Sequence, residues 1–155
     1  ISILHPADAP GIAALGLVSQ DLLTRLGFSV EMQTMDLNTF FGRRARPEGW
    51  HIFHTTNTVP DMQTPLQNAY LNGAGARGFV GWPESAAVET GRDAFAAAAD
   101  EPRRKAAAEQ VHRAAAEAGF YMPLGQFVAP SAWRAELQDV PTGPAMFLWN
   151  IRRGG

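Results

Sequence analysis

The sequence contains no cysteine, which excludes disulfide bonds, thiol catalysis, iron–sulfur clusters and cysteine-based zinc sites. It also lacks an excess of basic residues, because 13 Lys and Arg face 15 Asp and Glu and the net charge is −2. Proteins that bind nucleic acids normally carry a basic excess, so no nucleic-acid partner is expected. The sequence has no run of 18 or more apolar residues, so no membrane-spanning helix is predicted.

The remaining composition is that of a globular protein, with 46% hydrophobic and 18% charged residues. A chain of 155 residues can bury about 68–70% of the surface that its unfolded form exposes, which is enough for one core. We therefore expect a single domain over residues 1–155. Residues 1–4 already have the pattern of a strand, so we expect the chain to be part of a longer protein. The sequence contains no signal peptide, but the missing start could have carried one.

The first third of the chain has the pattern strand–helix–strand–helix–strand. Strands are predicted over residues 1–4, 28–35 and 50–55, and Asp36 is placed to cap a short helix over residues 37–44. The first helix begins near residue 10 and ends at Gly27, and its apolar stripe consists of Ile12, Leu15, Val18, Leu22 and Leu26. This order predicts a parallel sheet with covering helices.

The second half contains two predicted helices, over residues 85–99 and 100–118, after a glycine-rich connection at 72–81. The second helix has a stripe made mostly of alanine, which requires close packing against a neighbour, and we expect it to lie on a sheet face. Its opposite side should expose Lys105, Glu109, Arg113 and Glu117 to solvent. Further strands are predicted over residues 121–128 and 147–151.

Few residues are arranged for catalysis. His51 and His54 are three apart on a predicted strand and point to opposite faces, so we interpret the histidines as polar strand and surface residues and expect no metal site. No serine lies in a nucleophile elbow, no carboxylates are paired, and the glycine-rich stretch lacks the Lys-Ser/Thr end of a phosphate loop. We expect neither an enzyme nor a cofactor. A fragment of a small α/β hydrolase or nucleotide-binding domain stays an alternative, as does a structural or interaction domain.

Aromatic and polar residues occur in the loops next to the predicted strands. In open α/β sheets, ligands bind outside the carboxyl ends of the strands. Tryptophan can supply an apolar wall for a ligand, and an aspartate can pair with a cationic group. The candidate ligand-binding residues are therefore Trp50, Thr56, Asn57, Asp61 and Trp82. The alternative is core packing for each tryptophan and a turn after Pro60 for the aspartate.

Several short motifs occur in an order that resembles one protein family. They are Leu-Gly-Phe-Ser-Val-Glu at 26–31, Met-Asp-Leu-Asn-Thr-Phe at 35–40, Gly-Trp-His-Ile at 49–52, Asp61 followed by Pro65 and Leu66, Ala-Asp-Glu-Pro-Arg-Arg at 99–104, Tyr-Met-Pro-Leu-Gly-Gln at 121–126, Ala-Trp-Arg at 132–134 and Trp-Asn at 149–150. Together they resemble the extracellular solute-binding proteins of ABC importers, family 5, the peptide/nickel/dipeptide-binding group. The resemblance covers nearly the whole chain.

The resemblance implies the C-terminal lobe of a larger two-lobe receptor with a type II periplasmic-binding-protein fold, a mostly parallel sheet with helices on both faces. Such a receptor captures a small solute, an oligopeptide or related molecule, between its lobes and delivers it to a membrane permease. The implied partners are the solute, the ABC permease and the missing N-terminal lobe. The implied location is periplasmic or extracellular, with a possible membrane anchor at the missing N-terminus. Asp61 occupies the place of an aspartate that pairs with the α-amino group of peptide ligands, while other members bind nickel chelates, haem, sugars or opines.

Overall fold

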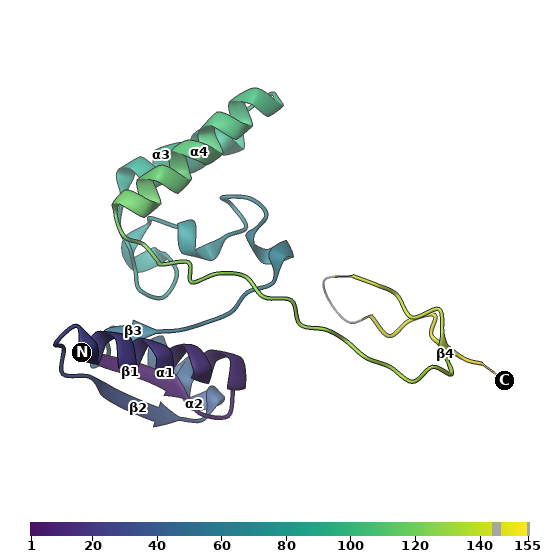
Figure 1. The fold of residues 1–155 in the computed structure, drawn as a ribbon. Coiled ribbons are helices and arrows are strands. Elements are labelled where there is room, and N and C mark those ends of the chain that lie inside the picture. Colours follow the sequence, from purple (N-terminus) through teal and green to yellow (C-terminus); the bar gives the residue numbers. More distant parts are fainter. Residues whose placement is uncertain (144–146, 155) are drawn as a thin grey trace.

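A three-stranded parallel sheet forms the first part of the chain in the computed structural model, which describes residues 1–143 and 147–154 (Figure 1). The central strand β1 (Ser2–Pro6) pairs with β2 (Glu31–Met35) on one side and β3 (Ile52–Phe53) on the other. Both pairings are parallel, with Ile3 opposite Met32 and Ile52. The predicted order of strands and helices is confirmed, although β2 and β3 are shorter than the sequence pattern predicts.

Helices cover both faces of this sheet. Helix α1 (Pro10–Arg25) lies on the face that carries His5, because a Cβ atom at Gly16 would lie 2.8 Å from the His5 Nδ1 atom. Helix α2 (Leu37–Arg44) lies on the opposite face, where the buried Phe40 ring meets Phe53 at a centroid distance of 6.2 Å. The chain is thus mixed α/β with a parallel sheet, as predicted.

The two helices end where the sequence indicates. Gly27 follows α1 with φ at +92°, in the left-handed region that favours glycine. Asp36 caps α2 by accepting a hydrogen bond from the Thr39 amide at 3.0 Å. The Thr39 side chain also donates to this carboxylate, and it is the main cause of the lowered pKa of Asp36. These local signals explain why the helix boundaries were predictable.

Only part of the apolar stripe of α1 is covered by the sheet. Ile12 and Leu15 are half-buried, but Val18, Leu22 and Leu26 are 50–68% exposed. The reason is that α1 approaches the sheet through its small residue Gly16, which brings the helix axis close to β1. The C-terminal half of the stripe therefore forms an apolar surface on the outside of the helix.

A second core is built around a pair of helices, α3 (Ala86–Ala97) and α4 (Glu101–Glu117). Three short 3-10 helices precede them: η1 (Val59–Met62), η2 (Ala69–Leu71) and η3 (Gly75–Arg77). The buried side chains of this core are Leu71, Val88, Val111 and Ala115.

The close packing expected for the alanine-rich helix α4 is confirmed, since a Cβ atom on Gly91 of α3 would lie 2.7 Å from the Val111 Cγ2 atom. The prediction that α4 lies on a sheet face is wrong. It packs against α3 and η2, away from the three strands (Figure 1). Its charged side, Lys105, Glu109, Arg113 and Glu117, is exposed as predicted.

The contact between Gly91 and Val111 leads to a testable difference between two glycines in helices. Alanine normally stabilises a helix interior relative to glycine by about 0.5–1 kcal/mol. We expect that gain for Gly42→Ala in α2, where nothing lies within 4 Å of the added Cβ atom. For Gly91→Ala we expect a net loss of about 1 kcal/mol, because overpacking costs about 1–3 kcal/mol. Urea denaturation of both variants measures the difference, and equal stabilisation would contradict the close packing.

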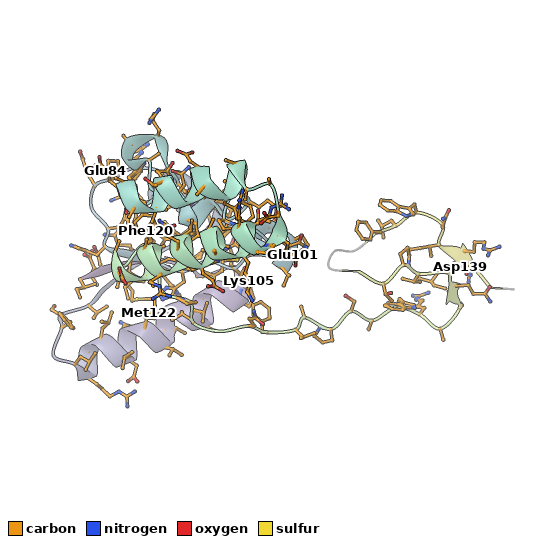
Figure 2. All side chains as sticks on the ribbon, turned by 90° about the horizontal axis from the view of Figure 1, so that it is seen from above. Glu84, Glu101, Lys105, Phe120, Met122 and Asp139 are labelled. Atoms are coloured by element: carbon orange, nitrogen blue, oxygen red, sulfur yellow. The ribbon has the colours of Figure 1, made fainter. Side chains whose placement is uncertain are left out.

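The segment after α4 runs away from the helices, past Met122 towards a small hairpin near Asp139 (Figure 2). That hairpin pairs β4 (Leu137–Gln138) with β5 (Arg152–Arg153) in antiparallel fashion. The strand predicted over residues 121–128 is wrong. Within the described residues this segment makes no backbone hydrogen bond, because no neighbouring strand lies beside it. The final strand likewise lies after residues 147–151, not within them.

No helix in the described part of the chain combines the length and the apolar character that crossing a membrane requires.

Candidate ligand-binding site

Two of the predicted site residues, Trp50 and Trp82, lie side by side although 32 positions separate them in the sequence. Their ring centroids are 6.2 Å apart, with an angle of 39° between the planes. Trp50 is held in place by a hydrogen bond from its indole N–H to the Arg46 carbonyl at 2.6 Å and by an edge contact with Phe53 at 5.3 Å. The two rings form a half-buried aromatic surface between β3 and the glycine-rich segment.

Trp82 adopts an unusual backbone conformation, with φ at +45°. A bulky residue in the left-handed region is strained, and such strain persists only where the surrounding structure imposes it. Here the Trp82 amide donates to the Phe79 carbonyl at 2.9 Å, while Gly81 before it has φ at +100°. The turn over residues 79–82 therefore presents the indole ring towards Trp50.

The glycine-rich segment forms a packed turn and not a phosphate loop. The Gly75 amide donates to the Pro83 carbonyl at 3.0 Å, and the Ser85 amide donates to the Gly73 carbonyl at 3.0 Å. A Cβ atom at Gly73 would lie 2.8 Å from the Ser85 carbonyl oxygen, so only glycine allows this approach. These pairings fix the chain on both sides of Trp82.

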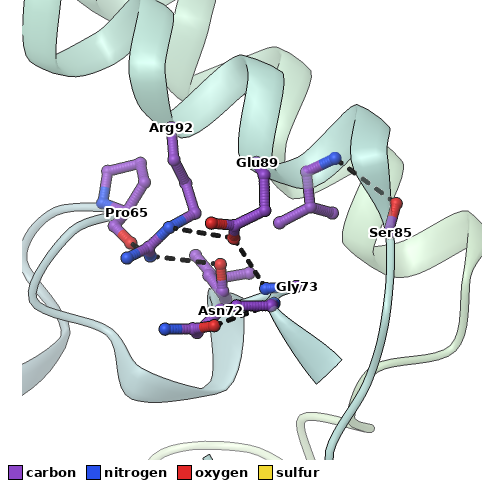
Figure 3. Close-up of polar contacts among 9 residues, drawn as sticks. Pro65, Asn72, Gly73, Ser85, Glu89 and Arg92 are labelled. Atoms are coloured by element: carbon purple, nitrogen blue, oxygen red, sulfur yellow. Dashed lines mark hydrogen bonds and ion pairs between the residues drawn. The ribbon is translucent and has the colours of Figure 1, made fainter. Parts of the chain in front are cut away.

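Two charged residues of α3 anchor the same segment (Figure 3). Glu89 accepts a hydrogen bond from the Gly73 amide at 2.8 Å and forms an ion pair with Arg92 at 3.3 Å. The Arg92 guanidinium in turn donates to the Leu71 carbonyl at 3.1 Å and to the Pro65 carbonyl. The Arg92 side chain is only 15% exposed, so this network joins α3 to the loop at a mostly buried position.

Sequence reasoning missed Arg44, which is surrounded by aromatic rings. Its guanidinium carbon lies 4.7 Å from the Phe41 centroid and 5.5 Å from both Phe53 and Phe79. These distances are those of cation–π contacts, which are strongest where the cation is partly desolvated. Burial lowers the pKa of Arg44. The signal was present in the sequence, since Phe40, Phe41 and Arg44 are spaced to share one side of a helix.

Arg44 connects the sheet to the second core through these rings. Phe53 belongs to β3, while Phe79 contacts Tyr70 at 4.9 Å and Tyr70 contacts Tyr121 at 5.6 Å. The aromatic surface of Trp50 and Trp82 thus continues into a row of rings around one guanidinium. This surface offers an apolar wall, and the guanidinium adds a positive charge at its inner end.

The other predicted site residues lie elsewhere. Thr56 and Asn57 are exposed in the loop after β3, whereas Trp50 precedes that strand. Asp61 is exposed in η1, where its carboxylate accepts a hydrogen bond from the Thr58 hydroxyl at 2.7 Å. Within the described residues, no hydrogen bond joins these three side chains to either tryptophan. Their participation in ligand binding stays a prediction.

The histidines differ from the surface residues that we expected. His51 and His54 do lie on opposite faces, since His51 Nδ1 meets the Ser2 hydroxyl at 2.9 Å while His54 Nε2 meets the Ser19 hydroxyl of α1 at 2.7 Å. However, His5 and His54 are buried, with 8% and 7% exposure. Burial and the neighbouring His5 lower the pKa of His54. In residues 1–143 and 147–154, no three His, Asp or Glu side chains come together in a way that could hold a metal ion.

The chain matches no protein-family profile. Over 158 aligned residues it is 24% identical to a protein of Sinorhizobium fredii (strain NBRC 101917 / NGR234) that is named "Probable peptide ABC transporter periplasmic-binding protein y4tO". The alignment covers 99% of this chain but 30% of that protein, so the chain spans about a third of the length of the curated relative. From end to end, this chain is therefore similar to one part of a protein named for peptide transport.

Proposed function

We propose that this chain is the C-terminal lobe of a two-lobe solute-binding protein of a peptide ABC importer, of the family 5 type. In this role it holds one side of a small solute, an oligopeptide or a related molecule, in a cleft between the lobes. The loaded protein then delivers the solute to the membrane permease, in the periplasm or outside the cell. The lobe itself performs no catalysis.

The similarity over 99% of the chain carries this proposal. The parallel sheet with a helix on each face is consistent with it. The extended segment adds support, because Met122, Phe127 and Val128 are 72–91% exposed and their backbone is unpaired within the described residues. Exposed apolar side chains on an extended segment without backbone partners favour a larger assembly in which another part of the protein covers them.

Each predicted site residue has a distinct role in this proposal. Trp50 and Trp82 form an apolar wall against side chains of the solute. Asp61 pairs with the α-amino group of a peptide, and Thr56 and Asn57 supply hydrogen bonds to its backbone. The exposed position of Asp61 suits a carboxylate that meets its partner only when a second lobe closes over the site.

One titration experiment separates the contribution of the apolar wall to binding from the contribution of the Asp61 charge. We expect Trp82→Ala to weaken binding of tripeptides about tenfold, whether or not the peptide amine is acetylated, because the ring contributes buried apolar area. We expect Asp61→Asn to weaken binding of free-amine peptides about tenfold and to leave acetylated peptides unchanged, because only the charge is lost. Calorimetry on the longest polypeptide encoded by the gene measures both effects.

Phe28→Ala serves as the control for general damage, since Phe28 is an exposed ring that belongs neither to the proposed wall nor to the rings around Arg44. A uniform loss of affinity in all three variants would indicate unfolding and not a binding site. Unchanged affinity in both Trp82→Ala and Asp61→Asn would contradict the site. If the polypeptide binds no peptide but hydrolyses generic esters or nucleotides, the alternative of an α/β enzyme fragment replaces the proposal.

A further inference from the structure

Two buried histidines lie next to each other at the carboxyl ends of neighbouring strands. Ile3 and Leu4 of β1 are opposite Ile52 and Phe53 of β3, so His5 and His54 follow in the same register on the same face of the sheet. That face is the one covered by α1. The pair therefore lies between the sheet and the helix.

Neither imidazole has a full set of hydrogen-bond partners. The His54 Nε2 atom meets the Ser19 hydroxyl of α1 at 2.7 Å, but the Nδ1 atoms of both histidines are buried without a partner in the described part of the chain. The His5 Nδ1 atom lies directly below Gly16, at 2.8 Å from the position of an added Cβ atom. A proton added to either Nδ1 atom would thus be a buried donor without an acceptor, which is costly.

The charged groups on the surrounding elements do not compensate for a positive charge at this position. On α1 the charged residues are Asp21 and Arg25, which pair with each other at 2.7 Å on the exposed side. The charged residues nearest along β1 and β2 are Asp8, Glu31 and Asp36, all of which are exposed, and Asp36 caps α2. The amino group of Ile1 is bonded to the Ser29 carbonyl at the far end of β1, and His51 lies on the opposite face.

We propose that His5 and His54 form a proton-sensitive latch between α1 and the sheet. Near neutral pH the two imidazole rings pack beneath Gly16, and the bond between His54 and Ser19 joins the end of β3 to the helix. In mild acid, protonation of His54 places an uncompensated charge in this interior and releases α1 from the strand ends. The loop that begins at Thr55, directly after His54, loses its anchor at the same time.

The direction of the pH dependence follows from linkage. Because burial lowers the pKa of His54 in the folded chain, the unfolded chain takes up this proton first as the pH falls below about 6.5. The stabilising contribution is therefore complete above that pH and declines as the pH falls towards the folded pKa. Carboxylates titrate mainly near pH 4, so the range from 7.5 to 5.5 isolates the histidines.

Two measurements on the chain test the latch. In the first, NMR of the imidazole carbon-bound protons follows His54 in the folded chain and in urea, and we expect the folded chain to titrate at lower pH. In the second, thermal unfolding compares wild type with His54→Gln and His5→Gln. We expect the wild-type Tm to fall by about 3 °C between pH 7.5 and 5.5, the shift that about 1 kcal/mol produces in a chain of 155 residues. His54→Gln should lose most of this fall, whereas His5→Gln should lose a smaller part, because burial is the larger cause of the lowered His54 pKa.

The exposed His112 provides the matched control, because His112→Gln removes one imidazole from the surface of α4. This variant should keep the wild-type fall in Tm. Amide exchange at pH 5.5 should show α1 and β3 losing protection before the α3 and α4 amides. The proposal would be overturned if His54 titrated identically in the folded chain and in urea. It would also be overturned if His54→Gln and His5→Gln both showed the same fall in Tm as the wild type. If the variants do not fold, the wild-type titration alone decides it. None of these readouts depends on solute binding.

Discussion

Replacing Phe40 by alanine is expected to lower the free energy of unfolding by about 3–5 kcal/mol, the usual cost of truncating a buried phenylalanine. Phe40 is fully buried and joins α2 to the sheet through its edge contact with Phe53. Its removal leaves a cavity between α2 and β3. Urea denaturation followed by circular dichroism measures the loss.

The neighbouring ring provides the control for this prediction. Phe41 is on the same helix and also contacts Arg44, but it is 44% exposed. Phe41→Ala should cost about 1 kcal/mol, the contribution of one partly exposed cation–π contact and a little buried area. Equal losses in the two variants would mean that the second face of the sheet is not packed as described.

Replacing Arg92 by methionine is expected to destabilise the chain by about 3 kcal/mol. Methionine keeps an unbranched apolar stem but removes the hydrogen bonds to the Leu71 and Pro65 carbonyls and the partner of Glu89. Breaking a mostly buried ion pair costs more than the pair contributes, because the remaining charge and carbonyl groups lose their partners. Thermal or urea unfolding gives the value.

Arg103→Met is a matched control, because Arg103 pairs with Asp100 at the same helical spacing but its side chain is 75% exposed. An exposed pair of this kind contributes about 0–1 kcal/mol, so its loss should be small. If Arg92→Met were equally mild, the Arg92 network would be a surface feature, and it could not fix the loop that carries Trp82.

The helices were predictable because their signals are local. Asp36 and Asp100 each accept a hydrogen bond from the amide three residues later, and Gly27 and Gly119 end helices with positive φ. The alternation of strands and helices was sufficient to predict a parallel sheet, because parallel strands need a crossover connection and this connection is usually a helix. The close approach of α4 to a neighbour was also readable from its alanine stripe.

The errors concern contacts between distant parts of the chain. Residues 121–128 have the composition of a strand, but a strand exists only where a partner supplies hydrogen bonds, and the described residues contain none beside them. Similarly, the pattern of α1 identified an apolar stripe but could not say which half of it the sheet would cover. The sequence also did not show that α4 packs against α3 and not against a sheet face.

In the candidate site, too, some contacts could be predicted from the sequence and others could not. Trp50 and Trp82 were proposed as walls of one site, and the structure brings their rings together. Arg44 was missed because four separate aromatic contacts define its environment, and two of these rings come from other elements. His51 and His54 were correctly assigned to opposite faces. The burial of His5 and His54 was not predicted, because it depends on the register between β1 and β3, which sequence spacing does not reveal.

The position of β1 in the middle of its sheet has a consequence for folding kinetics. Ile3 pairs with Met32 on one side and with Ile52 on the other, so the sheet forms only after two chain segments of different length have closed into loops. The helices α3 and α4 are separated by three residues and meet through local contacts. Because local contacts form faster than distant ones, we expect the helix pair to fold first during refolding. Strand β3, with its two paired residues, joins the edge last.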